Sequence, residues 1–472
     1  MWISIPGSER AQVGAPNPSS FLTASARLAS MRAMSPKEEA ARSIAQRLHE
    51  AGYIAYFAGG CVRDRLLGRE PQDYDIATNA PAALLQQLFA RTIPVGVQFG
   101  VVIVVDDGEP VEVATFRSDA AYLNGRHPSS VHFGSAEEDA RRRDFTINGM
   151  FLDPLADTVI DYVGGQADLR AGIIRAIGDP ACRISEDRLR MLRAVRLAAG
   201  LGFHIDPPTF AAIAAAASSI TDIAWERIGD EVVRILTDSE SGSARRGFEL
   251  LDRSGLLPPI LPEVAALKGV EQSPDCHPEG DVFVHTLRLL EQLEHPAETL
   301  ALGALLHDIA KPRCTQRSEQ RITFYGHCHV GAQMAVAICQ RLRRSRETWE
   351  RVALLVRDHL RLLHAPQMRL STLKRFLAAA HIEELLELAR LDTMASNENL
   401  TYYNFCRQKL RELGAEAIQP APLLRGRDLL ELGFEPNPRF GQILEAVTEA
   451  QLEGTLHTRE QAIAWVRERY RQ

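Results

Sequence analysis

Two aspartates two residues apart, Asp73 and Asp75, are the strongest chemical signal in this chain of 472 residues. Acidic and apolar residues alternate around them, which predicts a half-buried strand over 73–77 with both carboxylates on one face. Two like charges so close together are costly unless a cation lies between them, and carboxylate oxygens suit Mg²⁺. The pair therefore predicts metal-dependent phosphoryl chemistry, with Glu112 on a later strand as a third ligand. Taken alone, the two aspartates also fit a solvated strand.

A glycine turn stands shortly before this pair. Gly59 and Gly60 follow a short apolar run and precede a predicted helix over 62–67. Backbone without side chains can approach a triphosphate closely, and the N-terminus of the following helix favours anions. Arg63 adds a forked guanidinium for phosphate oxygens. We predict that Gly60 and Arg63 bind a nucleotide, although an ordinary strand-to-helix turn is the alternative.

A third charged group lies in a segment predicted as one helix over 186–201. On such a helix Asp187 and Arg190 are one turn apart and can share one ligand. A carboxylate that accepts from an exocyclic amine, beside a guanidinium that donates to the ring, imitates a Watson–Crick edge that suits C and A. Arg193 and Arg196 continue the stripe and are predicted to meet phosphates of the nucleotide or of a nucleic-acid end. A surface helix of ion pairs is the alternative.

An ordered series of histidines and aspartates follows in the second half of the chain. Imidazole and carboxylate groups both bind divalent metals, and the adjacent pair His307-Asp308 ends an apolar helix. Single histidines in helical proteins are more often ordinary core or surface residues. The whole series predicts a second metal site, and its members are His285, His307, Asp308, His327, His359 and Asp392.

The elements that must position these groups differ between the two parts of the chain. Short strands alternate with helices up to about residue 170, with strands at 101–105 and 111–116 around a turn at 106–108. Long helical segments dominate beyond residue 180. We therefore predict an α+β protein, in which a mixed sheet with helices is followed by an all-helical region.

Composition narrows the class of protein. With 45% hydrophobic and 24% charged residues, the chain is typical of a globular protein with several domains, and no stretch is apolar enough to span a membrane. Seven scattered cysteines without a CxxC pair indicate reduced thiols and a cytoplasmic location. The net charge of −7 requires a nucleic-acid binder to concentrate its arginines locally. Residues 1–34 are predicted to be a disordered tail, which leaves Met31 and Met34 as alternative starts.

Taken together, these motifs resemble a known family. The pattern GGxVRDxLLG followed by DxD, the segment RRDFTINGM at 142–150 and the EDxxR motif at 186–190 are similar to class II tRNA nucleotidyltransferases and bacterial poly(A) polymerases, within the DNA polymerase β superfamily. The resemblance implies that Arg143 and Asp144 contact the incoming nucleotide. It also implies that the loop over 116–133 helps to switch from C to A addition. Gly149 stands where the family usually has alanine.

The histidine series resembles the HD phosphohydrolase domain that some of these enzymes carry. The family often reads GHE where this chain reads Gly326-His327-Cys328-His329, which leaves the metal and the hydrolytic activity open. The final segment resembles the tail that holds tRNA. The resulting domain prediction is a tail over 1–34, a nucleotidyltransferase head over 35–170, a neck over 171–240 that selects the base and binds RNA, an HD body over 241–410 and a tRNA-binding tail over 411–472.

The resemblance implies addition of C, C and A to the 3′ end of tRNA from CTP and ATP, with Mg²⁺ as cofactor and a second divalent metal in the HD domain. No obligate protein partner and no membrane are expected. Three alternatives stay open: a poly(A) polymerase, an enzyme that adds only CC or only A, and an HD phosphohydrolase with a vestigial head.

Overall fold

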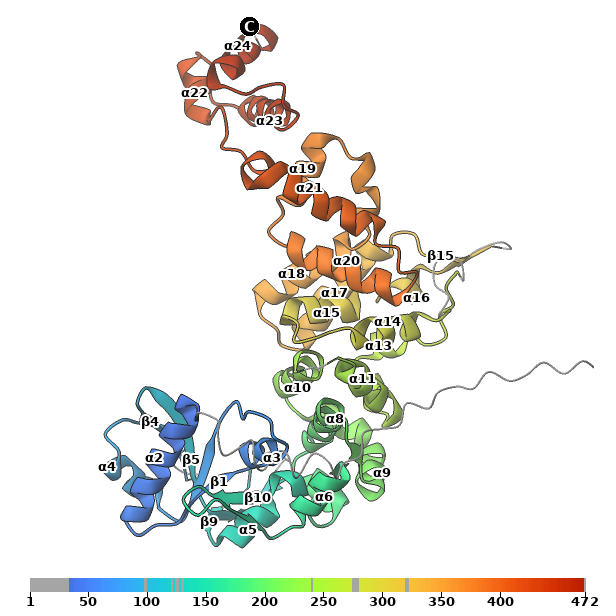
Figure 1. Ribbon diagram of the computed structural model, residues 1–472. Coiled ribbons are helices and arrows are strands. Elements are labelled where there is room, and N and C mark those ends of the chain that lie inside the picture. The colour runs from blue at the N-terminus through green and yellow to red at the C-terminus, as the bar shows by residue number, and fades with distance from the viewer. Residues whose placement is uncertain are drawn as a thin grey trace, which may run out of the picture. The chain divides into compact units, whose positions relative to one another are not determined.

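The computed structural model describes residues 34–96, 100–119, 122–123, 127–128, 131–238, 241–273, 280–318 and 322–470 (Figure 1). The predicted disordered tail lies almost wholly outside these residues, as do Gly125 and Arg126 of the predicted switching loop. The chain forms two compact units. The first comprises residues up to Arg190 together with Phe203–Ala212, and the second comprises Met191–Gly202 and Ile213 onward. The finer division into neck, body and tail stays a prediction.

A seven-stranded mixed sheet forms the centre of the first unit. Its strands follow the order β11 (Thr158–Asp161), β10 (Met150–Asp153), β1 (Ala55–Ala58), β2 (Asp75–Thr78), β5 (Glu109–Thr115), β4 (Val101–Asp106) and β3 (Thr92–Gly96). Only β2 and β5 pair in parallel, and the other neighbours are antiparallel. The predicted strands at 101–105 and 111–116 are confirmed within two residues.

Helix α2 (Pro36–Glu50) illustrates why the sequence folds this way locally. Ser35 caps its N-terminus by accepting a hydrogen bond from the amide of Glu38, and Pro36 occupies the first turn, where no amide donor is needed. Its apolar residues recur at helical spacing, so Ala41, Ile44 and Leu48 are all buried against the sheet.

Shorter elements complete the first unit. They are α3 (Gly60–Leu66), α4 (Ala82–Leu88), β6 (Arg117–Asp119), β7 (Tyr122–Leu123), β8 (His127–Pro128), β9 (Val131–Phe133), α5 (Ala136–Arg142), the 3-10 helix η4 (Thr146–Asn148), α6 (Gly165–Ala171), β12 (Ile173–Ile174), α7 (Pro180–Glu186) and β13 (His204–Ile205). Phe57, Phe116 and Phe151 are among its largest fully buried side chains. Phe116 and Phe151 share a buried cluster with Ala140 of α5, so these aromatic side chains hold the sheet against α5.

The second unit is almost entirely helical, as predicted. Its elements are α8 (Arg190–Leu201), α9 (Pro207–Ala216), which runs in from the first unit, η5 (Ala217–Asp222), α10 (Trp225–Thr237), α11 (Ser243–Arg253), α12 (Leu257–Ile260), α13 (Pro262–Ala265), α14 (Val282–Glu291), α15 (Glu298–Leu306), α16 (Lys311–Cys314), β14 (Gln316–Arg317), β15 (Ile322–Thr323), α17 (His327–Arg341), α18 (Arg346–Asp358), η6 (Arg361–Gln367), α19 (Leu370–Leu377), α20 (Ile382–Ala395), α21 (Thr401–Ile418), α22 (Gly426–Glu431), α23 (Arg439–Leu452) and α24 (Arg459–Arg469). Among the described residues, none of these helices is long and apolar enough to cross a membrane.

The last three helices share a hydrophobic core of their own, which we call the tail core. Its buried members are Leu424, Leu429, Ile443, Val447, Leu456, Ala462 and Val466. Helices α14, α15, α17, α18 and α20 pack against one another earlier in the unit, and their ends and facing sides carry the histidine series.

Candidate active site and metal centre

Asp75 and Glu112 lie side by side on the two parallel strands of the sheet. Asp75 of β2 is in register with Glu112 of β5, so both carboxylates project from the same face. Desolvation and the nearby Glu112, with a smaller contribution from Asp73, raise the pKa of Asp75 to about 6. Carboxylates that repel each other in this way form a donor set that fits a divalent cation.

Asp73 lies just outside the strand, which corrects the prediction that the strand covers 73–77. Strand β2 begins at Asp75 because its partner β1 ends at Ala58, which is the last residue in register with it. Lys37 of α2 then holds the preceding segment: its Nζ donates to Asp73 at 2.9 Å and to the carbonyl oxygen of Gln72 at 2.6 Å. Exposed and buried side chains nevertheless alternate in the residues just before the strand. Tyr74 is buried, whereas the side chain of Asp73 is 82% exposed.

The glycine turn bends the chain away from β1 immediately beside these carboxylates. Gly59 has φ of +76°, a conformation that residues with a Cβ rarely adopt, and a Cβ here would lie 3.1 Å from Nη1 of Arg143. Gly60 begins α3. Arg63 is held by other side chains: it donates two hydrogen bonds to Asp64 and one to Asn148, each of 2.8 Å. It thus ties α3 to η4, and its contact with phosphate stays a prediction.

Arg143 reaches the glycine turn from the end of α5. Its guanidinium donates to the buried Asp139 at 3.0 and 3.2 Å and lies 5.2 Å from the centre of the Phe151 ring. Burial alone would raise the pKa of Asp139, but the charges of Arg143 and Arg142 hold it below its usual value. Asp144 accepts from the amide of Phe145 and from Asn148, so it stabilises the turn into η4. The contacts of Arg143 and Asp144 with the nucleotide stay predictions.

The predicted helix over 186–201 is wrong at its start. Helix α7 ends at Glu186 and α8 begins at Arg190, with Asp187 in the break between them. Asp187 leaves the helix because its side chain accepts from the amide of Leu189 and its carbonyl oxygen accepts from that of Arg190. Arg190 instead pairs with Glu186 at 2.6 Å and donates to carbonyl oxygens of Arg183 and Arg142. Asp187 and Arg190 are therefore neighbours across a turn.

Two further arginines of the predicted stripe belong to the second unit. Arg196 donates to the buried Glu231 of α10 at 2.7 Å. Arg193 lies half-buried on the same helix. The structure thus assigns Arg196 to an ion pair inside its own unit, and the phosphate contacts of both residues stay predictions.

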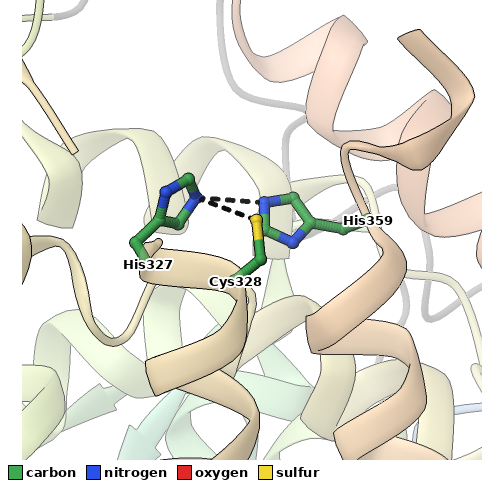
Figure 2. A group of neighbouring side chains, drawn as sticks. All are labelled: His327, Cys328 and His359. Carbon is green, nitrogen blue, oxygen red and sulfur yellow. Dashed lines mark hydrogen bonds between the residues drawn. The ribbon is translucent and has the colours of Figure 1, made fainter. Parts of the chain in front are cut away.

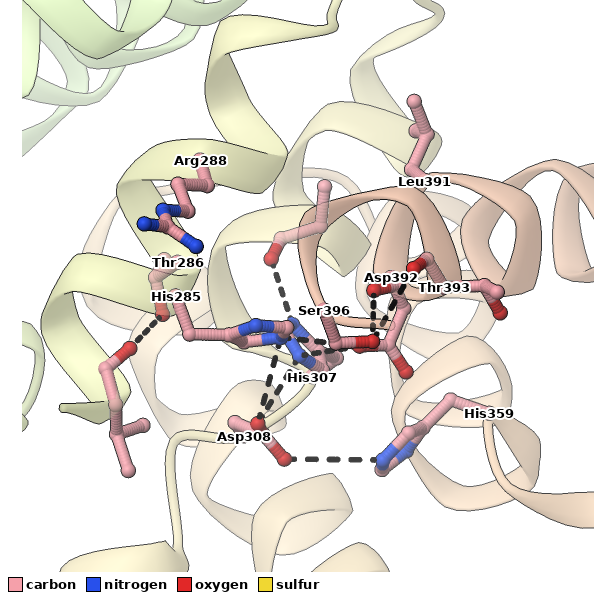
Figure 3. Close-up of polar contacts among 12 residues, drawn as sticks. His285, Thr286, Arg288, His307, Asp308, His359, Leu391, Asp392, Thr393 and Ser396 are labelled. Atoms are coloured by element: carbon pink, nitrogen blue, oxygen red, sulfur yellow. Dashed lines mark hydrogen bonds and ion pairs between the residues drawn. The ribbon is translucent and has the colours of Figure 1, made fainter. Parts of the chain in front are cut away.

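The histidine series converges on one largely buried cluster in the second unit, and Figure 3 shows the part of it around His307 and Asp308. His285 comes from α14, His307 and Asp308 from the end of α15, and Asp392 from α20. Nε2 of His285 lies 3.0 Å from Asp392 and 4.0 Å from Asp308. The two remaining members, His327 and His359, come from the start of α17 and the end of α18.

Three histidines of the cluster share one anchoring pattern. Each Nδ1 lies against the carbonyl oxygen three residues earlier: His307 against Ala304 at 2.9 Å, His327 against Phe324 at 2.8 Å and His359 against Val356 at 2.7 Å. A ring nitrogen that faces a carbonyl oxygen carries a proton, so in the neutral imidazole Nε2 is the nitrogen with the lone pair, and it lies on the cluster side. Metal-binding histidines are held in this way, and the residues present therefore fit a metal ion.

Asp308 stands between the two groups of histidines. Its Oδ2 lies 3.1 Å from Nε2 of His307, and its Oδ1 lies 3.4 Å from Nε2 of His327. Lys311, three residues later, is also buried and lies 2.6 Å from Oδ2. Burial alone would raise the pKa of Asp308, but His307 and Lys311 hold it well below the usual value. A charged carboxylate thus faces both halves of the cluster.

Cys328 joins the half of the cluster formed by His327 and His359 (Figure 2). Its Sγ lies 3.6 Å from Nε2 of His327, which in turn lies 3.4 Å from Nε2 of His359. Burial would raise the pKa of the thiol, yet contacts with the two imidazoles lower it to about 6.

The sequence prediction missed four residues that support these sites. Asp139 stands three and four residues before Arg142 and Arg143, and Lys311 stands three residues after Asp308. Helical ion-pair spacing was the signal for each. Glu186 stands four residues before Arg190 and has the same spacing, whereas Asn148, which binds Arg63, carried no separate signal because that contact depends on the tertiary arrangement.

Three family models match the chain in succession. A Poly A polymerase head domain matches residues 55–175, a "Probable RNA and SrmB- binding site of polymerase A" matches 202–268, and an HD domain matches 281–392. The chain is 47% identical to a CCA-adding enzyme of Limosilactobacillus fermentum over 199 residues, which are 42% of this chain and 50% of the relative. It is 41% identical to poly(A) polymerase I of Salmonella typhimurium over 237 residues, which are 48% and 50%.

The fold is also similar to solved structures. The CCA-adding enzyme of Bacillus stearothermophilus in complex with CTP superposes with a TM-score of 0.67 at 27% identity, over 93% of this chain and 98% of that one. The chain spans about half the length of the curated relatives it matches. The chain thus joins regions that match a Poly A polymerase head domain and an HD domain, and it is similar to CCA-adding enzymes and to poly(A) polymerases.

Proposed function

We propose that the first unit is a template-independent nucleotidyltransferase that adds C, C and A to the 3′ end of tRNA from CTP and ATP. The observation that carries this proposal is the pairing of Asp75 with Glu112 beside the glycine turn. Relatives named CCA-adding enzymes support it, including a structure in complex with CTP. Because some relatives are poly(A) polymerases, a poly(A) tail is the second candidate product.

Asp73, Asp75 and Glu112 are the residues that would hold the divalent metal, which we propose to be Mg²⁺ because all three donors are carboxylate oxygens. The bound metal supplies charge neutralisation at the triphosphate and favours ionisation of the attacking hydroxyl. Lys37 forms an ion pair with Asp73, and a metal ion bound there would compete with it for the carboxylate. Lys37 thus compensates part of the negative charge that the three carboxylates carry.

The surrounding groups bind and choose the nucleotide in this proposal. Gly60 and the adjoining turn bring bare backbone to the triphosphate, with Arg143 beside Gly59. Arg63 and Asp144 hold α3 and η4 around that turn. Asp187 and Arg190, across the turn between α7 and α8, present an acceptor and a donor to the base.

The experiment that tests the activity uses tRNA lacking its 3′ CCA, with CTP and ATP supplied singly and together. Addition of two C residues with CTP, followed by one A when ATP is present, is the expected result. A long A tail on tRNA that ends in CC would identify a poly(A) polymerase. Addition of only CC or only A would identify a partial enzyme.

The Asp75→Asn and Asp73→Ala variants test in the same assay whether these carboxylates hold the metal. Metal-held charge stabilisation is worth several kcal/mol, and about 1.4 kcal/mol corresponds to tenfold in rate, so Asp75→Asn should lower incorporation at least about 10³-fold. Binding of tRNA should remain near that of the unaltered chain. Normal incorporation by either variant would refute the metal role.

A second activity is proposed for the histidine cluster, namely metal-dependent hydrolysis of phosphate esters. The inward Nε2 atoms of three anchored histidines, next to the charged Asp308, support it. Hydrolysis of a 2′,3′-cyclic phosphate and of a phosphate monoester, with and without divalent metal, tests the idea. Asp308→Asn should abolish hydrolysis and leave CCA addition unchanged. Hydrolysis that survives this substitution would contradict the proposal.

We also propose that the protein binds tRNA and that it acts in the cytoplasm. The segment matched to an RNA-binding site of polymerase A and the tail are proposed to hold the tRNA body. Six cysteines that the structure describes are free, which fits a reducing compartment.

A further inference from the structure

Cys328 is the one sulfur donor that the described residues place in the histidine cluster (Figure 2). It follows His327 at the start of α17, where the helix begins after Gly326 in a left-handed conformation. The potential donor atoms of His327, Cys328 and His359 all lie within 4.8 Å of one another. The nucleotidyl-transfer proposal makes no use of this thiol.

The separations match the geometry of a tetrahedral metal site. With metal–nitrogen bonds of about 2.05 Å and a metal–sulfur bond of about 2.3 Å, tetrahedral angles place two nitrogens about 3.4 Å apart and a nitrogen and a sulfur about 3.6 Å apart. The structure has Nε2 of His327 at 3.4 Å from Nε2 of His359 and at 3.6 Å from Sγ of Cys328. Right angles, as in an octahedral site, would require about 2.9 and about 3.1 Å.

We propose that Cys328, His327 and His359 bind a divalent transition metal of the Zn²⁺ class, with Cys328 as a thiolate ligand. Oδ1 of Asp308, at 3.4 Å from Nε2 of His327, supplies the fourth donor. The inference rests on the proposal that the cluster binds divalent metal. It adds the identity of a ligand and the class of ion at one half of the cluster.

The two imidazoles are already oriented for this role. Nδ1 of His327 and of His359 each face a backbone carbonyl oxygen, which directs both Nε2 atoms toward the thiol. Binding displaces the thiol proton, so the thiolate becomes the ligand. All three side chains are at least partly buried, which limits competition from water.

The donor chemistry separates the two halves of the cluster. Thiolate and imidazole favour borderline-soft ions such as Zn²⁺ and Co²⁺, whereas Mg²⁺ favours oxygen. The other half offers His285, His307 and Asp392, with nitrogen and oxygen donors only. Asp308 directs Oδ2 to His307 and Oδ1 to His327, so one carboxylate serves both. The halves should therefore differ in metal preference.

Cobalt substitution of the full chain tests the inference without any assay of activity. Co²⁺ bound to a thiolate gives a near-ultraviolet charge-transfer band, and the unaltered chain should show it. Cys328→Ser should lose the band and bind the metal of this half at least about tenfold more weakly, since even loss of a supporting residue costs 10–100-fold. Cys182→Ser, which removes an exposed thiol of the first unit, should keep the band.

A measurement on the unaltered chain guards against a misfolded variant. Zn²⁺ should protect Cys328 from alkylation, read by mass spectrometry, while Cys182 reacts equally with and without metal. Cys328→His should retain metal without the charge-transfer band. Bound Co²⁺ without the band, or a band that survives in Cys328→Ser, would overturn the thiolate role and leave metal binding by the cluster in place. A chain that binds neither Co²⁺ nor Zn²⁺ would overturn both.

Discussion

At the scale of single residues, the sheet of the first unit places two carboxylates that repel each other side by side. Asp75 and Glu112 are in register on parallel strands, and desolvation together with the charge of Glu112 raises the pKa of Asp75 to about 6. The fold therefore bears an electrostatic cost, which a bound cation would relieve. Function and stability conflict at such sites, because the donors needed for chemistry repel one another until the ligand arrives.

The conflict predicts that Asp75→Asn makes the metal-free head more stable while abolishing incorporation. A carboxyl with a raised folded pKa destabilises the fold above that pKa. The gain in folding stability from Asp75→Asn should thus be complete above pH 6, shrink between pH 6 and about pH 4, and vanish below about pH 4. After discounting for the exposure of the side chain, we expect roughly 1 kcal/mol. Hydrogen exchange of peptides from β2 and β5, in chelator at pH 8 and pH 5, measures it.

Glu112→Gln is the matched control for this prediction, because the repulsion is mutual and its removal from either side should have the same sign. Equal protection of the unaltered chain and both variants at pH 8 would contradict the electrostatic account.

At the scale of elements, two breaks in regular structure position the site. The chain leaves β1 at Gly59, which brings the start of α3 beside Arg143, and it leaves α7 at Asp187, which turns the carboxylate out of the helical register. The first break depends on the positive φ of Gly59, and the second depends on the hydrogen bonds that Asp187 accepts from the amides of Leu189 and Arg190. Each can be tested by one substitution.

Gly59→Ala should weaken nucleotide binding as well as stability. Alanine at positive φ costs about 1–2 kcal/mol, and here its Cβ would also press on Arg143 at 3.1 Å. Gly52→Ala is the control, since Gly52 has φ of +84° but nothing within 4 Å of an added Cβ. Both variants should lose stability to urea, and only Gly59→Ala should raise KM for CTP. A similar KM change in the two variants would show that Arg143 is not involved.

Asp187→Ala should relax base choice while preserving transfer. Loss of a polar contact to the base is worth about 1–3 kcal/mol, so discrimination of CTP and ATP against GTP and UTP should fall by about 10- to 100-fold. Competition between labelled nucleotides measures the ratio. Asp187→Asn keeps an acceptor for the turn bond to Leu189 but adds an amide donor, and should also disturb choice. Unchanged preference in both variants would remove Asp187 from base selection.

At the scale of the whole molecule, the chain divides its chemistry among separately packed parts. The carboxylates of the head belong to the first unit, and the histidine cluster and the tail core belong to the second. Each part buries its own apolar side chains. A change inside one core should therefore alter the function of that part first.

Leu429→Ala tests the proposal that the tail holds tRNA. Leu429 is fully buried in the tail core, so its truncation should cost about 2–5 kcal/mol, whereas the adjacent Leu430 is 50% exposed and its truncation should be nearly neutral. We expect Leu429→Ala to raise KM for tRNA severalfold with kcat for CTP addition unchanged. Leu430→Ala should match the unaltered chain. An unchanged KM, with the tail unfolded by hydrogen exchange, would exclude tRNA binding by the tail.

The sequence by itself determined whatever depends on residue type and local period. The alternation around Asp73 and Asp75 and the spacing of the histidine series belong to this class, and each led to the observed element or cluster. A side-chain period of two or of 3.6 is written in consecutive residues, so it needs no knowledge of partners. The α+β order of the chain followed from the same periods.

Only the tertiary structure decided which charged groups meet. Arg63 pairs with Asn148 and Arg196 with Glu231, although the sequence had assigned both arginines to the nucleotide or to phosphate. The break at Asp187 and the position of Cys328 against two histidines from different helices emerged in the same way. Such contacts join elements brought together by packing of the core, and a long, flexible charged side chain satisfies its charge with whichever partner that packing places within reach.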